Sequence, residues 1–226
     1  MNQADSLEHD AISQKAKIQS SLKMAVDTLF PRPILGQILN ELNTLFPELN
    51  IQLHETTLSR CAELLEDGTV DVGIASLIPR GYTGRLATTI ELYAVAHLSH
   101  PLLQQKDLQL KALEPYKQIV IRDGGFRSNT NSGWLGSTSR ITVSSLSEAV
   151  SCVKQQLGFA WLPFWVLQLP ENKDLAQLPL QNGLIRTVAL QTVVRQTETE
   201  DHFIKELGRV MDNFIVKLNK YQSRCE

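Results

Sequence analysis

Apolar and polar residues alternate with two different periods along the first third of the chain. Residues 22–29 carry apolar side chains at every second position, as a strand with one buried face does. Residues 33–46 carry them at the i, i+3, i+4 and i+7 spacing of an amphipathic helix. A strand over 47–57, a helix over 58–68 and a strand over 70–76 follow. This order of strands and helices predicts a parallel sheet with right-handed crossovers.

A second set of alternating elements begins near residue 118. We expect strands over 118–123, 140–145 and 159–163 and a helix over 145–158. Two longer extended stretches, 85–98 and 184–196, flank this set, and we interpret them as strands that cross between two lobes. An amphipathic helix over 198–222 closes the chain and is expected to return to the first lobe. The predicted fold is α/β, with two Rossmann-like lobes joined by crossing strands.

Small hydroxyl residues follow the first three predicted strands. Thr28, Thr57 and Ser76 each lie just past a strand end, and the carboxyl ends of parallel strands form the crevice where ligands bind. Asp27 lies at the opening of the same crevice. A carboxylate there repels an anionic ligand, unless the carboxylate is turned away or paired. Asp71, at the start of the third strand, is either a ligand group or a carboxylate that caps local backbone after the preceding turn. We favour the capping role.

Composition narrows the classes of protein that fit. The chain has 226 residues, with 42% apolar and 20% charged residues, as an ordinary globular protein has. Its 22 Lys and Arg against 24 Asp and Glu leave a net charge of −2, so no broad basic surface is expected to bind a phosphate backbone. Its three cysteines are far apart, and neither a signal peptide nor a membrane-spanning apolar run is visible. We expect a cytoplasmic protein.

Motifs of nucleophilic catalysis, metal hydrolysis and nucleotide binding are missing from the sequence. His97 and His100 stand close together, but two histidines without a third ligand more often serve at the surface or as caps. We expect no metal, no cofactor and no enzymatic activity.

Two segments leave alternatives open. Residues 123–133 offer backbone N–H groups, hydroxyls and Arg127 to an anion, or form a surface loop. Trp161, Phe164 and Trp165 either wall an apolar ligand pocket or pack in the core.

The ordered motifs carry a family resemblance. LKMAVDTLFPRPILGQILNELNTLFPELNIQLHETTLSRCAELLEDGTVDVGIAS, residues 22–76, resembles the start of the effector-binding domain of LysR-type transcriptional regulators. The segments HLSHPLL, LQLKALEPYKQIVI and SSLSEAVSCVKQQLGFAWLP match the second lobe of that domain in the same order. The resemblance covers about residues 20–215 and implies a fold like that of type II periplasmic binding proteins, with a small-molecule inducer between the lobes.

The resemblance also implies which residues contact the inducer. By position these are Asp27, Thr28, Leu29, Thr56, Thr57, Ser76, Leu77, Arg122, Asp123, Ser144, Pro163 and Phe164. Many members of the family have a small polar residue where Asp27 stands. This departure weakens the case for a carboxylate inducer, whereas the helix N-termini beside Thr28 and Thr57 favour one.

The same resemblance implies partners and boundaries. We expect a homodimer through the helices over 33–46 and 145–157, and a tetramer at full length. We expect the end of a linker helix over 1–21, lobe I over 22–92 and 194–226, and lobe II over 93–193. In such regulators DNA is bound by an N-terminal winged helix-turn-helix, so we expect this chain to begin inside a longer regulator.

Two other classes share this architecture. A solute-binding protein of a transport system needs export, and an enzyme on the same scaffold needs a convergent acid, base or nucleophile. The sequence shows neither feature, so we expect a regulatory domain.

Overall fold

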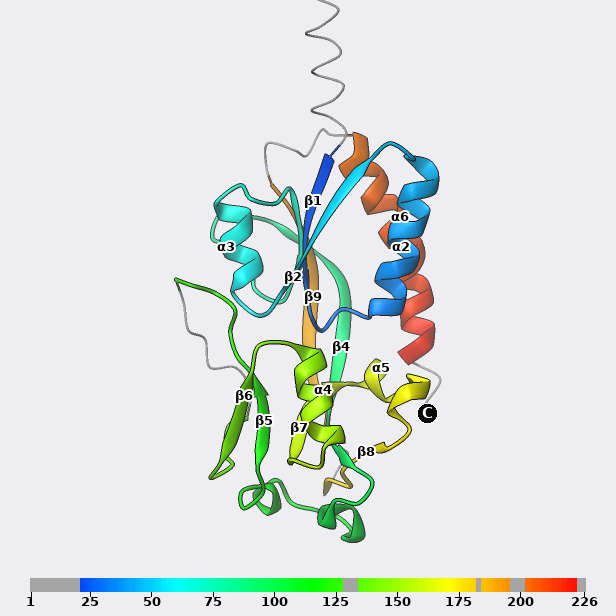
Figure 1. Cartoon of the computed structure of the whole chain (residues 1–226). Coiled ribbons are helices and arrows are strands. Elements are labelled where there is room, and N and C mark those ends of the chain that lie inside the picture. Colours follow the sequence, from blue (N-terminus) through cyan, green and yellow to red (C-terminus); the bar gives the residue numbers. More distant parts are fainter. Residues whose placement is uncertain (1–20, 128–133, 182–183, 196–201, 223–226) are drawn as a thin grey trace, which may run out of the picture.

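The computed structural model describes residues 21–127, 134–181, 184–195 and 202–222 (Figure 1). The linker-helix end expected over 1–21 lies outside these ranges except for Ser21, which begins a strand. Within these ranges nine strands form one mixed sheet, in the order β2-β1-β3-β9-β4-β7-β5-β6, and β8 pairs with β4. Figure 1 shows two lobes, one above the other, joined by β4 (Gly84–His97) and β9 (Arg186–Val194). The predicted α/β fold with two lobes and crossing strands is confirmed.

Lobe I is built from three parallel strands covered on both faces. Its elements are β1 (Ser21–Asp27), α2 (Arg32–Leu45), β2 (Asn50–Thr56), α3 (Arg60–Glu66), β3 (Val72–Ala75) and α6 (His202–Gln222). β1 lies between β2 and β3 and is parallel to both, and β3 pairs antiparallel with β9. The predicted helix over 198–222 is confirmed as α6, which packs against α2; its residues 198–201 lie outside the described ranges.

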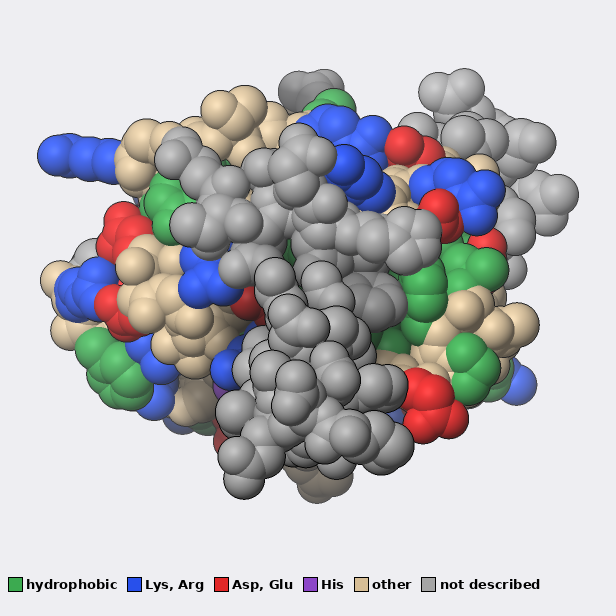
Figure 2. Space-filling view, turned by 90° about the horizontal axis from the view of Figure 1, so that it is seen from above, with side chains coloured by type: hydrophobic (Ala, Val, Ile, Leu, Met, Phe, Trp, Pro, Cys, Tyr) green, Lys and Arg blue, Asp and Glu red, His purple; other side chains and the backbone are tan. Residues whose placement is uncertain are grey.

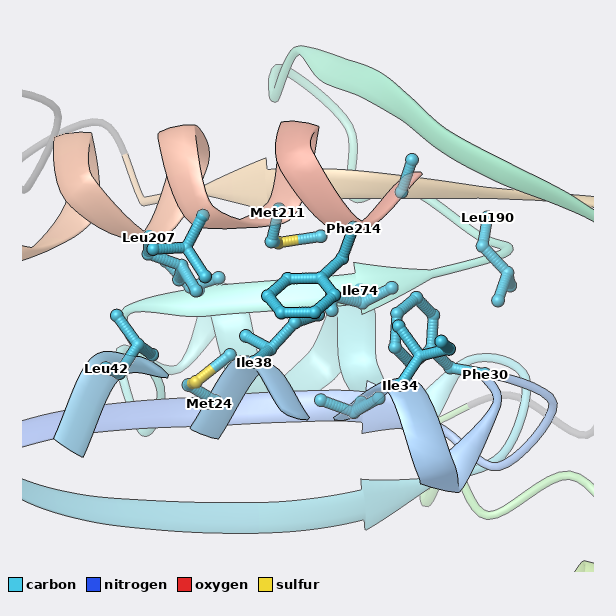
Figure 3. Packing of buried hydrophobic residues seen from close by; sticks show 14 of the residues in the cluster. Met24, Phe30, Ile34, Ile38, Leu42, Ile74, Leu190, Leu207, Met211 and Phe214 are labelled. Atoms are coloured by element: carbon cyan, nitrogen blue, oxygen red, sulfur yellow. The ribbon is translucent and has the colours of Figure 1, made fainter. Parts of the chain in front are cut away.

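The core of lobe I follows from the alternation in β1 and β3. Met24 and Ile74 point to the face covered by α2 and α6, and Ala25 and Ala75 point to the face covered by α3. Figure 3 shows the side chains of α2 turned toward those of α6 across this core. The facing residues are Ile34, Ile38 and Leu42 of α2 and Leu207, Met211 and Phe214 of α6.

Lobe II repeats the alternation of strands and helices with shorter elements. They are β5 (Gln118–Ile121), β6 (Arg140–Val143), α4 (Leu146–Lys154), β7 (Phe159–Pro163), α5 (Phe164–Leu167) and β8 (Leu175–Gln177), with 3-10 turns at Pro101–Gln104, Leu110–Leu113 and Pro170–Asn172. α4 begins with a capping box, in which the Ser145 hydroxyl accepts from the N–H of Glu148 and the Glu148 side chain accepts from the N–H of Ser145.

The helix predicted over 145–158 is shorter in the structure and ends at Lys154. Gln156 has a φ of 61° and Gly158 a φ of 153°, so the backbone leaves the helical conformation there. A Cβ at position 158 would collide with the Lys117 carbonyl, which explains why a glycine stands at this crossing.

The crossing strands β4 and β9 are paired with each other where they leave lobe I. Their register runs from Gly84 opposite Val193 to Leu92 opposite Arg186. Leu92 also pairs with Pro163 of β7, so β4 changes its partner from one lobe to the other at this residue. None of the helices in the described ranges is long and apolar enough to cross a membrane.

Candidate functional site

A cavity of about 500 Å³ lies between the lobes and is lined by residues of both. This volume is in the range of about 300–1,000 Å³ typical of small-molecule sites. Lobe I contributes Asp27, Thr28, Leu29, Thr57, Leu58, Ser76 and Leu77. The crossing strands contribute Leu92, Arg186, Thr187, Val188, Ala189 and Gln191, and lobe II contributes Gln118, Ile119, Val120, Ile121, Trp134, Leu135, Ala160 and Trp161.

Six of the residues that the sequence assigned to an inducer site line this cavity: Asp27, Thr28, Leu29, Thr57, Ser76 and Leu77. They come together because β1, β2 and β3 are parallel, so the segments that follow these strands meet at one edge of the sheet.

Asp27 is the carboxyl group of this cavity. It is 3% exposed, and its two oxygens accept hydrogen bonds from the N–H of Leu29 (3.0 Å) and the hydroxyl of Ser76 (3.1 Å). Burial raises the pKa of the Asp27 carboxyl to about 6, although these two donors act in the opposite direction. The Ser76 hydroxyl is therefore already donating to Asp27.

The two threonines of the cavity also have protein partners. The Thr28 hydroxyl donates to Glu55 at 2.7 Å, and Glu55 in turn binds Arg32. The Thr57 hydroxyl donates to the carbonyl of Arg122 in lobe II at 3.0 Å. Thr57 therefore connects the two lobes directly.

Leu58 lines the cavity in a left-handed conformation, with a φ of 49°. Such a conformation costs a non-glycine residue about 1 kcal/mol or more. It is held between Thr57 and Ser59, which both bind lobe II.

Arg186 supplies a positive charge to the cavity wall. Its guanidinium carbon lies 4.3 Å from the ring centre of Trp161, in cation–π contact. Burial lowers the pKa of the Arg186 guanidinium. The described residues include no carboxylate paired with Arg186.

The other assigned residues lie outside this cavity. Thr56 is buried and, with Ser144, lines a separate polar cleft of about 340 Å³. Arg122 is exposed and donates to the Ser144 hydroxyl at 3.1 Å. Pro163 is buried in β7, and Phe164 lines a mostly apolar cavity of about 220 Å³ between α2 and α5.

Asp123 joins the lobes instead of lining the cavity. It is 8% exposed, and its Oδ1 accepts from the N–H (3.0 Å) and the hydroxyl (2.8 Å) of Ser59, at the start of α3. The N–H groups of Phe126 (2.9 Å) and Arg127 (2.7 Å) donate to the Glu63 carboxylate of α3. For this loop an anion site and a surface loop were both left open, and two of its N–H groups bind a carboxylate of the same chain; its residues 128–133 lie outside the described ranges.

The structure also decides the alternatives for three polar residues. Asp71 has a structural role, as favoured, but its partners are the N–H of Lys23 (2.9 Å) and the Arg195 guanidinium (3.0 Å), not the local turn. His97 binds Ser99, and His100 accepts from the N–H of Leu102 as the cap of a 3-10 turn.

Two free cysteines lie in the described part of the chain, Cys61 buried and Cys152 half-buried. No three His, Cys, Asp or Glu side chains gather there in a metal-binding arrangement. Burial raises the pKa of the Cys61 thiol to about 12, which keeps it protonated.

Sequence reasoning missed several residues of the cavity wall, among them Arg186, Gln118 and Trp134. Trp161 was left as either a pocket wall or a core residue, and it lines the cavity. The one signal for Arg186 was its place in an apolar extended stretch, where an unpaired charge is costly.

Two α/β lobes, a pair of crossing strands and a cavity between them define a protein with the fold of type II periplasmic binding proteins. The chain belongs to the LysR substrate binding domain family, whose model matches residues 15–212.

Curated relatives are transcriptional regulators. The chain is 29% identical over 178 residues to the HTH-type transcriptional regulator EstR of Acinetobacter baylyi, covering 70% of this chain and 56% of EstR. It is 24% identical over 186 residues to an uncharacterized HTH-type regulator of Bacillus subtilis, YvbU, covering 80% of this chain and 60% of YvbU. The chain thus spans less than two thirds of the length of either relative.

Solved structures show the same fold. The effector binding domain of a BenM variant superposes with a TM-score of 0.69 at 21% identity, covering 88% of this chain and 96% of that one. The regulatory domain of Synechocystis CcmR in complex with 2-PG has a TM-score of 0.68 at 14% identity, covering 86% and 97%.

Proposed function

We propose that this chain is the effector-binding regulatory domain of a LysR-type transcriptional regulator. It binds a small molecule between lobe I (22–92 and 194–226) and lobe II (93–193) and has no enzymatic activity. The observation that carries the proposal is the cavity of about 500 Å³, whose wall is shared by both lobes and by the crossing strands. A ligand there contacts both lobes at once, so it stabilises the relative orientation that fits it best.

The remainder of the regulator is part of the same proposal. The relatives are HTH-type regulators, and the E226K mutant of full-length BenM superposes over 94% of this chain with a TM-score of 0.70. DNA binding belongs to an N-terminal domain of such a regulator. Charged side chains of both signs are intermixed on the described surface in Figure 2, and the net charge of −2 gives no attraction to phosphates. We place the protein in the cytoplasm.

The proposed dimer pairs the helices over 33–46 and 145–157, and two dimers form a tetramer at full length. The outward face of α2 supports this assignment. Its exposed residues are uncharged or apolar: Pro33, Gly36, Gln37, Asn40, Asn43, Thr44 and Leu45, with Arg32 at the first position as the exception. Depletion of charge is typical of the centre of a protein interface.

A cavity-filling substitution tests the proposed site. Ala189 is exposed at the cavity wall on β9, so Ala189→Trp occupies ligand space without displacing core side chains. Purified chain is screened by thermal unfolding against small metabolites, where a ligand at 100 times its Kd adds about 2.7 kcal/mol of stability. We expect a saturable response in the wild type that Ala189→Trp abolishes.

Leu86→Trp is the matched control, because Leu86 is 60% exposed on the partner strand β4 and does not line the cavity. It should respond as the wild type does. An unchanged response in Ala189→Trp would show that the ligand binds elsewhere.

A further inference from the structure

Arg186 is a partly buried cation whose counter-charge is missing from the described part of the chain. Its guanidinium lies over Trp161 at 4.3 Å, and its side chain has neither an ion pair nor a hydrogen bond among the described residues. A guanidinium offers five N–H donors and accepts nothing. Arg186 is half-buried, and none of its nitrogens is among the buried atoms that lack a partner in the described residues, so the guanidinium remains open to the cavity, where a ligand with acceptor atoms can pair with it.

The sheet places Arg186 and Trp161 on one face. Arg186 is opposite Leu92 on β4, and Trp161 is opposite Ala94 on the same strand. Opposed residues, and residues two apart on a strand, share a face. The small side chain of Ala94 leaves room for the Arg186 side chain to reach across β4 to Trp161.

The surroundings of Arg186 are mainly apolar. Leu92, Ile121, Val188 and Trp134 line the same cavity, and a wall of this kind favours a ring or an alkyl chain. The indole Nε1 of Trp161 is a second donor without an acceptor in the described part of the chain. The same wall also holds a buried acceptor without a partner in the described part of the chain, Gln118 Oε1, so a ligand with a donor atom beside its acceptor atoms would satisfy both kinds of group.

The Asp27 carboxyl limits the charge that the ligand carries. It lines the same cavity and already accepts from Leu29 and Ser76, so it offers no donor to a second anionic group. A dianion would have one charge paired with Arg186 and another in an apolar cavity beside a carboxyl group.

We propose that the ligand of this cavity is a monocarboxylate with an apolar ring or chain, whose carboxylate pairs with Arg186 and whose body lies against Trp161 and Trp134. This inference rests on the proposed function and specifies its ligand class. The pairing is a charge-assisted, bidentate contact of the kind that guanidinium forms with carboxylate.

A purely structural Arg186 would hold Trp161 in place. Arg186→Met separates the two roles, because methionine keeps an apolar stem and a favourable contact with the indole while removing the charge. We expect the ligand-free variant to unfold at the same temperature as the wild type or higher. A Tm lower by several degrees would assign Arg186 to the fold and overturn the proposal.

Ligand class is tested with matched probes at up to 50 mM by calorimetry and thermal unfolding. The probes are phenylacetate and phenylacetamide, hexanoate and hexanamide, and phenyl phosphate as the dianion. We expect each acid to bind at least tenfold more tightly than its amide and than phenyl phosphate. Arg186→Met should reduce this preference to within twofold, and Arg122→Met, a control outside the cavity, should keep it.

The outcomes separate this inference from the proposed function. Amides that bind as well as acids, tighter binding of phenyl phosphate, or an acid preference that survives in Arg186→Met would overturn the ligand class and leave a small-molecule site. No binding of any probe to the wild type would overturn the ligand class and count against the proposed site as well.

Discussion

Asp27 shows how burial sets the behaviour of a single residue in this cavity. Its pKa rises from 3.8 to about 6 on folding, so the folded chain holds this proton more tightly than the unfolded chain does. The protonated Asp27 carboxyl therefore makes its full contribution to the stability of the folded state below about pH 4. This contribution is lost as the pH rises through about 6. At pH 7 the ionised carboxylate costs about 3 kcal/mol relative to the protonated form.

Asp27→Asn removes this cost and keeps both hydrogen bonds, because an amide accepts from Leu29 and donates to Ser76. We expect the variant to be more stable than the wild type by about 1–3 kcal/mol at pH 7. At pH 4.5 the difference should fall to roughly a third of its value at pH 7. Urea unfolding at both pH values measures the difference, and a variant that is less stable at pH 7 would show that the carboxylate's hydrogen bonds outweigh its desolvation.

At the scale of elements, α3 and the segment after β5 form a polar contact between the lobes. Gly124 and Gly125 allow the close approach, since a Cβ at either position would collide with Thr57 or Ser59. Burial opposes ionisation of Glu63, but the N–H groups of Phe126 and Arg127 and the Arg60 guanidinium together lower its pKa. Its contribution to stability is therefore present above the usual pKa of glutamate and is lost as the pH falls through the lowered value.

Glu63→Gln should lower the free energy of unfolding at pH 7 by about 1–3 kcal/mol, because two charge-assisted hydrogen bonds lose their anion. The amides of Phe126 and Arg127 should exchange hydrogen faster, which mass spectrometry of the corresponding peptide measures. Glu66→Gln is the control: Glu66 also binds Arg127, but at the surface, so its loss should cost less than about 1 kcal/mol. An equal loss of unfolding free energy in the two variants would show that the buried contact of Glu63 contributes no more to stability than the surface contact of Glu66.

The sequence predicted elements well where they are long enough to show a period. The alternation in 22–29 and the helical spacing in 33–46 predicted β1 and α2 to within a few residues. β8 and α5 were missed because elements of three and four residues show no period.

The topology of the sheet brings some of the predicted site residues together, and others lie elsewhere. Thr28, Thr57 and Ser76 line one cavity because parallel strands end at one edge. Asp123 also follows a strand, but its partner Ser59 is 64 residues away and was invisible to local reasoning. Arg186 was missed because its position depends on the register between β4 and β9, which no spacing along the chain reveals.

At the scale of the whole molecule, the proposed dimer has a direct test in α2. Gly36 is exposed at the middle of the outward face, and a Cβ there meets no atom within 4 Å. Gly36→Arg places a charge in the proposed interface, and arginine favours a helix over glycine by up to about 1 kcal/mol. We expect the variant to remain folded and to be monomeric by sedimentation at concentrations where the wild type is a dimer.

Gln109→Arg adds the same charge at an exposed position of lobe II outside α2 and α4, so it should leave the dimer intact. A Gly36→Arg variant that still dimerises would place the interface elsewhere.

The path of β4 and β9 also determines the order in which the two lobes are completed during synthesis. The chain leaves lobe I along β4 and returns along β9, and the lobe I core needs Leu190 of β9 and Met211 of α6. During synthesis on the ribosome, the elements of lobe II from β5 to β8 therefore emerge while lobe I still lacks β9 and α6. Until β9 and α6 emerge, part of the apolar surface of β1 and α2 stays uncovered, and surface exposed in this way favours aggregation of the nascent chain.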